Sequence, residues 1–87
     1  MQKPSLARMV LAVGGKAKAN GNELAPAVIT RVWSEREDGS WLVNATLLPD
    51  ASAPAVITSV YLFEDEQAAR DSLQHETSTA LFWPPRV

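Results

Sequence analysis

Two nearly identical stretches decide the fold of this 87-residue chain: APAVITRVW at Ala25–Trp33 and APAVITSVY at Ala53–Tyr61. Val, Ile and Thr branch at Cβ and fit the pleated surface of a strand. Proline lacks a backbone N–H, so it is tolerated at the first position of a strand and poorly inside one. We therefore expect Pro26 and Pro54 each to mark the entrance of a strand.

Regular alternation along each copy assigns its side chains to two faces. The faces are Val28, Thr30 and Val32 against Ile29, Arg31 and Trp33 in the first copy, and Val56, Thr58 and Val60 against Ile57, Ser59 and Tyr61 in the second. Apolar residues occur on both faces. This pattern is expected when one side of the strand fills a barrel and the other is partly covered.

The connections favour one structural solution used twice over a duplicated functional element. A solenoid needs at least three repeats, and this chain has two, joined by segments that differ. SEREDGS at 34–40 carries Asp38-Gly39, a strong hairpin signal, and leads into an alternating strand at Trp41–Leu48. PDASAP at 49–54 then returns the chain. The two copies should therefore flank strand 41–48 on either side.

The remaining elements follow from shorter signals. Ala7–Val13 predicts a first strand with Met9, Leu11 and Val13 on one face, ended by Gly14-Gly15. KAKANGNELA at 16–25 is expected to be a loop with an Asn20-Gly21 turn. EDEQAARDSLQHET at 64–77 predicts a short helix with a Glu66/Arg70 pair, and STALFW at 78–83 a last strand stopped by Pro84-Pro85.

Together these elements predict a mainly β fold, a small five-stranded SH3-like barrel with one short helix before the last strand. The chain is expected to form a single domain over residues 1–87, because a chain of this length builds one core. An OB-like barrel is the alternative, although its helix usually falls between the third and fourth strands.

Composition indicates the cell compartment and the oligomeric state that we expect for the protein. Cysteine is absent, which excludes a disulfide framework and thiolate metal ligands and favours a reducing compartment, so we expect a cytoplasmic location. No stretch approaches the ~20 apolar residues that cross a bilayer. A small domain without disulfides or metal gains stability by burying more surface in self-association. We therefore expect a homo-oligomer.

The charge is unevenly spread along the chain. The net charge is −2, with +4 over residues 1–33 and −6 over residues 34–87. A sequence-independent nucleic-acid binder normally presents a broad basic face. The acidic balance therefore argues against general nucleic-acid binding.

Residues suited to catalysis are few. His75 is the single histidine and lies near the predicted helix end, where a surface role is expected. Glu64-Asp65-Glu66 are better explained by the helix N-terminus than by a metal ion. GGKAK lacks the spacing of a phosphate-binding loop. We therefore expect no enzyme activity, no metal and no cofactor.

Surface recognition remains as the expected role. Strand-end aromatic residues can form a recognition platform or cap the core, and Trp33 and Trp41 could also pair across the hairpin. Basic side chains at 16, 18 and 31 suit an anion such as a nucleotide phosphate. The candidate ligand-binding residues are Lys16, Lys18, Arg31, Trp33, Trp41 and Tyr61. The stiff tail ALFWPPRV is expected to seal the barrel mouth or dock onto a neighbouring subunit.

Three segments resemble small, mostly uncharacterised proteins of tailed phages and prophages that end in a Trp-Pro-x-Arg-Val-like tail. They are Lys3-Pro4 with Ala7–Val10, Ala27–Val32 and Phe82–Val87. The resemblance implies a phage accessory protein that binds a host component or sequesters a small nucleotide-like signal in the host cytoplasm. A small virion structural or decoration protein is the alternative.

Overall fold

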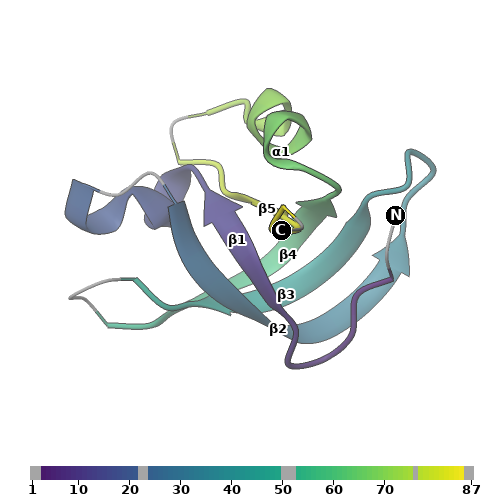
Figure 1. The fold of residues 1–87 in the computed structure, drawn as a ribbon, viewed down its shortest axis with the longest axis horizontal. Coiled ribbons are helices and arrows are strands. Elements are labelled where there is room, and N and C mark those ends of the chain that lie inside the picture. The colour runs from purple at the N-terminus through teal and green to yellow at the C-terminus, as the bar shows by residue number, and fades with distance from the viewer. Residues whose placement is uncertain (1–2, 22–23, 50–52, 76, 86–87) are drawn as a thin grey trace.

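The computed structural model describes residues 3–21, 24–49, 53–75 and 77–85, which form a closed barrel with the strand order β1-β2-β3-β4-β5 (Figure 1). The elements are β1 (Met9–Val13), η1 (Gly15–Gly21), β2 (Leu24–Glu35), β3 (Trp41–Leu47), β4 (Ala55–Phe63), α1 (Glu66–Ser72) and β5 (Ala80–Phe82). None of the helices in these ranges is long and apolar enough to span a membrane.

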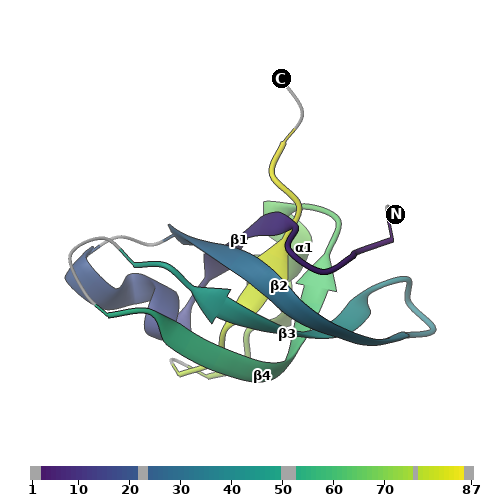
Figure 2. The same cartoon turned by 90° about the horizontal axis from the view of Figure 1, so that it is seen from below.

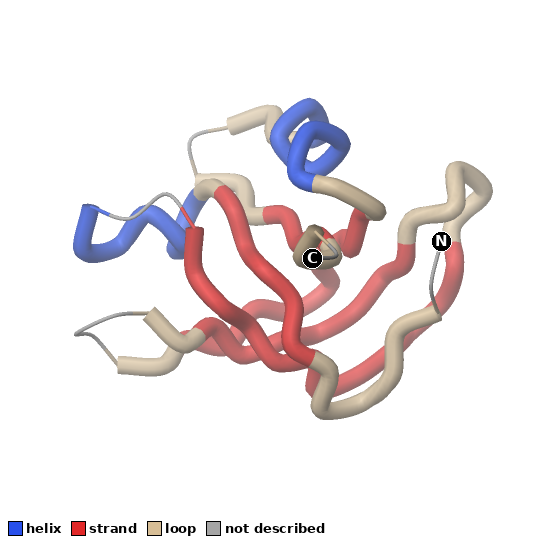
Figure 3. Tube along the Cα trace, viewed as in Figure 1, coloured by secondary structure: helices blue, strands red, loops and turns tan. Residues whose placement is uncertain are grey.

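The expected mainly β fold is confirmed. Neighbouring strands pair antiparallel, except that β4 and β5 run parallel. The two helical segments lie on the outside of the barrel (Figure 3), and α1 connects β4 to β5. That position of the helix is consistent with an SH3-like barrel and differs from the OB-like alternative.

The two repeated stretches flank β3, as expected, and their equivalent residues pair with the same residues of it. Ile29 and Ile57 lie opposite Ala45 from its two sides. One step along the barrel, Val32 and Val60 lie opposite Val43. Ile29, Ile57 and Val60 are buried, while Val32 packs against the core from a partly buried position. The repeat therefore supplies matching core rows on both sides of the central strand.

The expected regular alternation is wrong at the centre of both copies, because each contains a β-bulge opposite Asn44. In β2, Thr30 is the extra residue between Ile29 and Arg31. In β4, the two residues Thr58 and Ser59 lie opposite the single residue Asn44. Ser59 adopts φ 54°, which few non-glycine residues do. A bulge shifts the side-chain period by one residue and bends the strand. Ile and Val therefore both point inward although three positions separate them.

The Asn44 side chain connects the two bulged strands. Its Oδ1 accepts the Trp33 indole N–H at 2.9 Å and the backbone N–H of Ser59 at 2.8 Å. One acceptor thus serves a donor on β2 and a donor on β4. The N–H of Ser59, freed from the β3 ladder by the bulge, is paired by this side chain.

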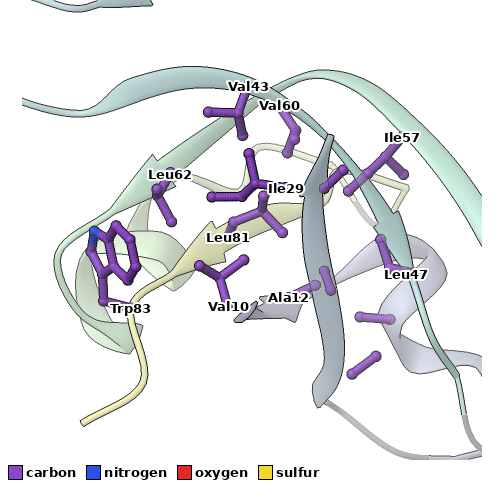
Figure 4. Close-up of a cluster of buried hydrophobic side chains, with 14 residues drawn as sticks. Val10, Ala12, Ile29, Val43, Leu47, Ile57, Val60, Leu62, Leu81 and Trp83 are labelled. Atoms are coloured by element: carbon purple, nitrogen blue, oxygen red, sulfur yellow. The ribbon is translucent and has the colours of Figure 1, made fainter. Parts of the chain in front are cut away.

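The barrel has two apolar layers. The interior contains residues of every strand, including Val10, Ile29, Leu62 and Leu81 (Figure 4), and Trp83 closes one end of it. A second cluster lies under α1, where Val13, Ala69, Ala80 and Phe82 are buried. β1 serves both layers, since Val10 and Ala12 face the interior while Leu11 and Val13 pack under α1.

Several elements differ from expectation. β3 ends at Leu47 rather than Leu48, α1 covers Glu66–Ser72 of the expected 64–77, and β5 covers Ala80–Phe82 of the expected 78–83. β1 begins at Met9 rather than Ala7, and the expected loop 16–25 contains the 3-10 helix η1. Pro54 does precede its strand, but Pro26 lies inside β2. The carbonyl of Pro26 accepts the N–H of Leu48, just beyond the end of β3. The N–H and the C=O of one residue point to the same side of a strand, so a backbone N–H at position 26 would also point toward Leu48. Leu48 lies beyond the end of β3, so the proline lacks its donor at a place where the β2–β3 ladder has already ended.

We expect Asn44→Ala to lower the free energy of unfolding by about 1–2 kcal/mol, because it leaves two donors without their acceptor. Thr46→Ala is the matched control, since Thr46 also lies on the outer face of β3 and is half-buried without side-chain hydrogen bonds among the described residues. Urea denaturation measures both variants. Equal losses for the two would contradict the clamping role of Asn44.

Among the described residues, the β2–β3 hairpin contains the one carboxylate whose pKa is displaced. Asp38 Oδ1 accepts the Ser40 hydroxyl at 2.6 Å and the Ser40 backbone N–H at 2.9 Å, and these two bonds, with the Arg36 guanidinium nearby, lower the pKa of Asp38 below its ordinary value. The folded state therefore binds the Asp38 proton less readily than the unfolded chain does. The resulting stabilisation exists above the unfolded pKa and is lost as the pH falls.

We expect wild type to exceed Asp38→Ala in stability at pH 7, with the difference shrinking below about pH 4 as the carboxylate protonates. Thermal unfolding over a pH series checks this. Glu37→Ala removes a neighbouring hairpin carboxylate that makes no hydrogen bond within the described residues and serves as control. A gap between wild type and Asp38→Ala that is constant from pH 7 to pH 2 would argue against the assignment.

Candidate functional site

A trough of about 500 Å³ runs along β4, and we call it the β4 trough. Its floor is Val56–Tyr61, and its wall is the end of α1 with the chain that leads into β5, residues 72–74 and 77–80. β4 pairs with β5 only through Leu62 and Phe63. The trough therefore lies where these two strands diverge and the β4–β5 ladder is open.

The trough is rich in hydroxyl groups and carries one cation. Lys16 of η1 is the one charged side chain among the described residues that line it. Thr58 and Ser59 contribute hydroxyls from the floor, and the wall contributes Ser72 and Thr77–Thr79. The hydroxyls of Ser72 and Thr79 donate to backbone carbonyls of Ala69 and Gly14, so these two act toward a ligand as acceptors.

Gly14 and Gly15 place Lys16 at the trough. Both adopt positive φ, 81° and 50°, and the chain there passes directly against the wall segment. A Cβ on Gly14 would lie 2.6 Å from the Ser78 carbonyl oxygen, and one on Gly15 would lie 2.6 Å from the Thr77 carbonyl oxygen. The paired glycines therefore allow η1 to begin beside the wall, with Lys16 as its next residue.

Tyr61 lines the same trough and is held by a cation. The residue is 39% exposed, and the Arg36 guanidinium lies 4.1 Å from the centroid of its ring. This stacking is a favourable cation–π contact that restricts the ring. Of the six residues expected to bind a ligand, Lys16 and Tyr61 thus share one hollow.

Arg31 and Trp33 form a second arrangement on the outer face of β2, which we call the Arg31–Trp33 pair. The guanidinium lies 3.7 Å from the indole centroid, and Asn44 holds the indole N–H. Trp33 is 47% exposed. The bulges of β2 turn these side chains outward, and neither of them lines the β4 trough.

The other two expected residues lie elsewhere. Lys18 is exposed on η1 and does not line the β4 trough. Trp41 packs against the interior core and its register partner on β2 is Glu35, so a Trp33–Trp41 pair across the hairpin does not form. Lys3 lies 5.9 Å from the Trp41 ring centroid. Trp41 thus caps the core, as one reading of the strand-end aromatics anticipated.

The C-terminal aromatic residue seals the barrel. Trp83 is 9% exposed within the core cluster, with the Arg8 guanidinium 5.3 Å from its ring centroid. Pro84 and Pro85 are exposed and lead away from the barrel (Figure 2). Beside them lies a second hollow of about 470 Å³, bounded by Glu64–Gln67 and Phe82–Pro85, which we call the tail hollow.

Acidic residues at the start of α1 act as expected for a helix N-terminus. The Asp65 side chain accepts the Ala68 N–H as an N-cap, and Glu66 pairs with Arg70 at 2.7 Å. Within the described residues, no group of three or more His, Asp or Glu side chains is placed to hold a metal ion.

The wall of the trough was missed by sequence reasoning. The sequence predicts a helix at Ser72 and the start of a strand at Ser78-Thr79. Hydroxyl side chains in such a connection do not by themselves indicate that it borders a hollow. The spacing of Gly14-Gly15 before Lys16 was the available signal, because paired positive-φ glycines often mark a close approach of two backbones.

Comparisons with protein-family models, curated proteins and solved structures match this chain to none of them.

We expect Gly15→Ala to lower the free energy of unfolding by more than Gly39→Ala does. Both positions have positive φ and share that backbone cost of about 1–2 kcal/mol. A Cβ at Gly39 meets nothing within 4 Å, whereas one at Gly15 meets the Thr77 backbone. Thermal unfolding of the two variants isolates the packing contribution, and equal losses would show that the wall does not press on the glycines.

Proposed function

We propose that this chain is a non-catalytic binding protein that sequesters a small nucleotide-like anion in the β4 trough. The observation that supports this proposal most directly is that Lys16 lies in a hollow lined by hydroxyl side chains. An ammonium group supplies a point charge for phosphate, and hydroxyls supply bonds to phosphate and sugar oxygens. The volume falls within the range of small-molecule pockets, roughly 300–1,000 Å³.

Tyr61 gives the trough a place for a planar base. Its ring is partly exposed at the trough, and aromatic rings bind nucleobases by stacking without regard to sequence. Lys16 and Tyr61 come from different elements, η1 and β4. A ligand with an anionic group and a flat ring would use both, whereas inorganic phosphate would use only the lysine.

Binding without turnover is supported by the composition of the site. The titratable side chains among the described residues of the trough are Lys16 and Tyr61. General acid–base chemistry at neutral pH usually requires a histidine or carboxylate within hydrogen-bond reach of the substrate. His75 is exposed and does not line the trough.

The proposed setting is a phage accessory protein acting in the cytoplasm of the host cell, where sequestration would remove a host signal. The resemblance of the segments around Ala7–Val10, Ala27–Val32 and Phe82–Val87 supports this setting. A small virion structural or decoration protein, the alternative, would need an exposed aromatic residue in its tail to anchor it to a shell. Trp83 is buried in the barrel core, so no specific observation favours that role.

Isothermal titration calorimetry with a panel of nucleotides and cyclic nucleotides tests the proposal. We expect at least one of them to bind, and Lys16→Ala to weaken that binding by roughly 10- to 100-fold, the usual effect of losing a charged hydrogen bond. The matched control is Lys18→Ala, which removes an equal charge from the same helix outside the trough.

The matching nucleoside, which lacks phosphate, should bind weakly and equally to wild type and Lys16→Ala. No heat from any nucleotide would defeat the proposed function. Equal losses in the two lysine variants would also defeat it, because they would assign the effect to overall charge rather than to the trough.

A further inference from the structure

Two uncovered features of the barrel complement each other in chemistry. The Arg31–Trp33 pair is a protruding cation on an exposed ring, and the tail hollow is a recess with one acidic wall and one proline wall. Neither Arg31 nor Trp33 lines the tail hollow of its own chain. In the closed barrel β1 lies between β2 and β5, and within one copy the two features are separate sites on the surface.

The Arg31–Trp33 pair has the properties of an interface anchor. Trp, Tyr and Arg dominate the residues that carry binding energy at protein interfaces. Stacking on the indole at 3.7 Å and the Asn44 bond hold both side chains in place before any contact forms, which reduces the entropy lost on association. Arg31 has no carboxylate partner among the described residues, so its guanidinium edge remains available.

The tail hollow offers the matching groups. Pro84 and Pro85 are exposed, and proline rings pack well against aromatic faces, as in the docking of proline-rich segments on aromatic grooves. On the opposite wall, Asp65 and Glu66 are already bonded within α1. Glu64 is exposed and has no bonded partner among the described residues, which leaves it free to accept a guanidinium.

We propose that the Arg31–Trp33 pair of one copy inserts into the tail hollow of a second copy. Trp33 packs against Pro84 and Pro85, and Arg31 pairs with Glu64. Each copy gives one pair and receives another, so the contact either closes reciprocally into a two-fold dimer or repeats head to tail into a ring or an open chain of copies. This inference does not depend on the proposed ligand of the β4 trough.

Sedimentation velocity and light scattering over a concentration series test the contact. We expect wild type to assemble beyond a monomer. Trp33→Ala and the double variant Pro84→Gly/Pro85→Gly should each raise the dissociation constant by roughly 30-fold or more, the effect of losing an interface hot spot. Leu6→Ser is the matched control, because Leu6 is an apolar residue 64% exposed and outside both features and the β4 trough. That variant should assemble like wild type.

Mixing the two defective variants gives the sharpest outcome. The Trp33→Ala copy retains a tail hollow, and the proline variant retains an Arg31–Trp33 pair, so the mixture can form one intact contact. We expect the mixture to form a dimer and nothing larger, although each variant alone is monomeric. A mixture that stays monomeric would refute the proposed contact.

A charge exchange separates this contact from general loss of fold. Arg31→Glu and Glu64→Arg should each weaken assembly, and the double variant should recover it, because the opposite charges meet again with exchanged sides. Circular dichroism of every variant should match wild type. A wild-type protein that remains monomeric at all concentrations overturns the inference, as does a double variant no better than either single change.

Discussion

The barrel depends on one constraint, the paired bulges on either side of Asn44. Each repeated stretch must turn two apolar residues inward across a bend, and a bulge achieves this by shifting the side-chain period once. β3 stays regular between them, with Val43 and Ala45 buried on both sides of Asn44. The Asn44 oxygen bonds to both neighbouring strands. The closure of the barrel is thus supported by the local backbone geometry of the bulges, by core packing and by the Asn44 side-chain acceptor.

The same bulges create the surfaces available for binding. The β2 bulges turn Arg31 and Trp33 outward, while the β4 bulge puts Ser59 in the floor of the β4 trough. Because β4 and β5 pair over only two residues, the rest of β4 borders an open hollow rather than a ladder. Gly14 and Gly15 then bring η1 and Lys16 to its edge. The features that close the barrel are therefore the ones that shape its candidate site.

The three tryptophans and Tyr61 divide into two groups according to whether they face the barrel interior or its outside. Trp41 and Trp83 face inward and cap the core, and both bury an indole N–H that has no hydrogen-bond partner among the described residues. Trp33 and Tyr61 face outward, and each carries an arginine over its ring. The inward pair contributes apolar burial at the cost of an unpaired donor. The outward pair remains accessible in a fixed geometry, which is what recognition requires.

The sequence by itself determined the strand count, the flanking of β3 by the repeats, the hairpin at Asp38-Gly39 and the helix before β5. These follow from residue type and spacing over a few neighbours, and local patterns carry that information directly. Tertiary structure alone decided which face each repeat residue takes, because a bulge depends on pairing with Asn44 across two strands. It also decided that Lys16 and Tyr61 share a trough, while Lys18 and Trp41 lie outside it. Those positions result from the closure of the barrel, which brings together residues that are distant in the chain.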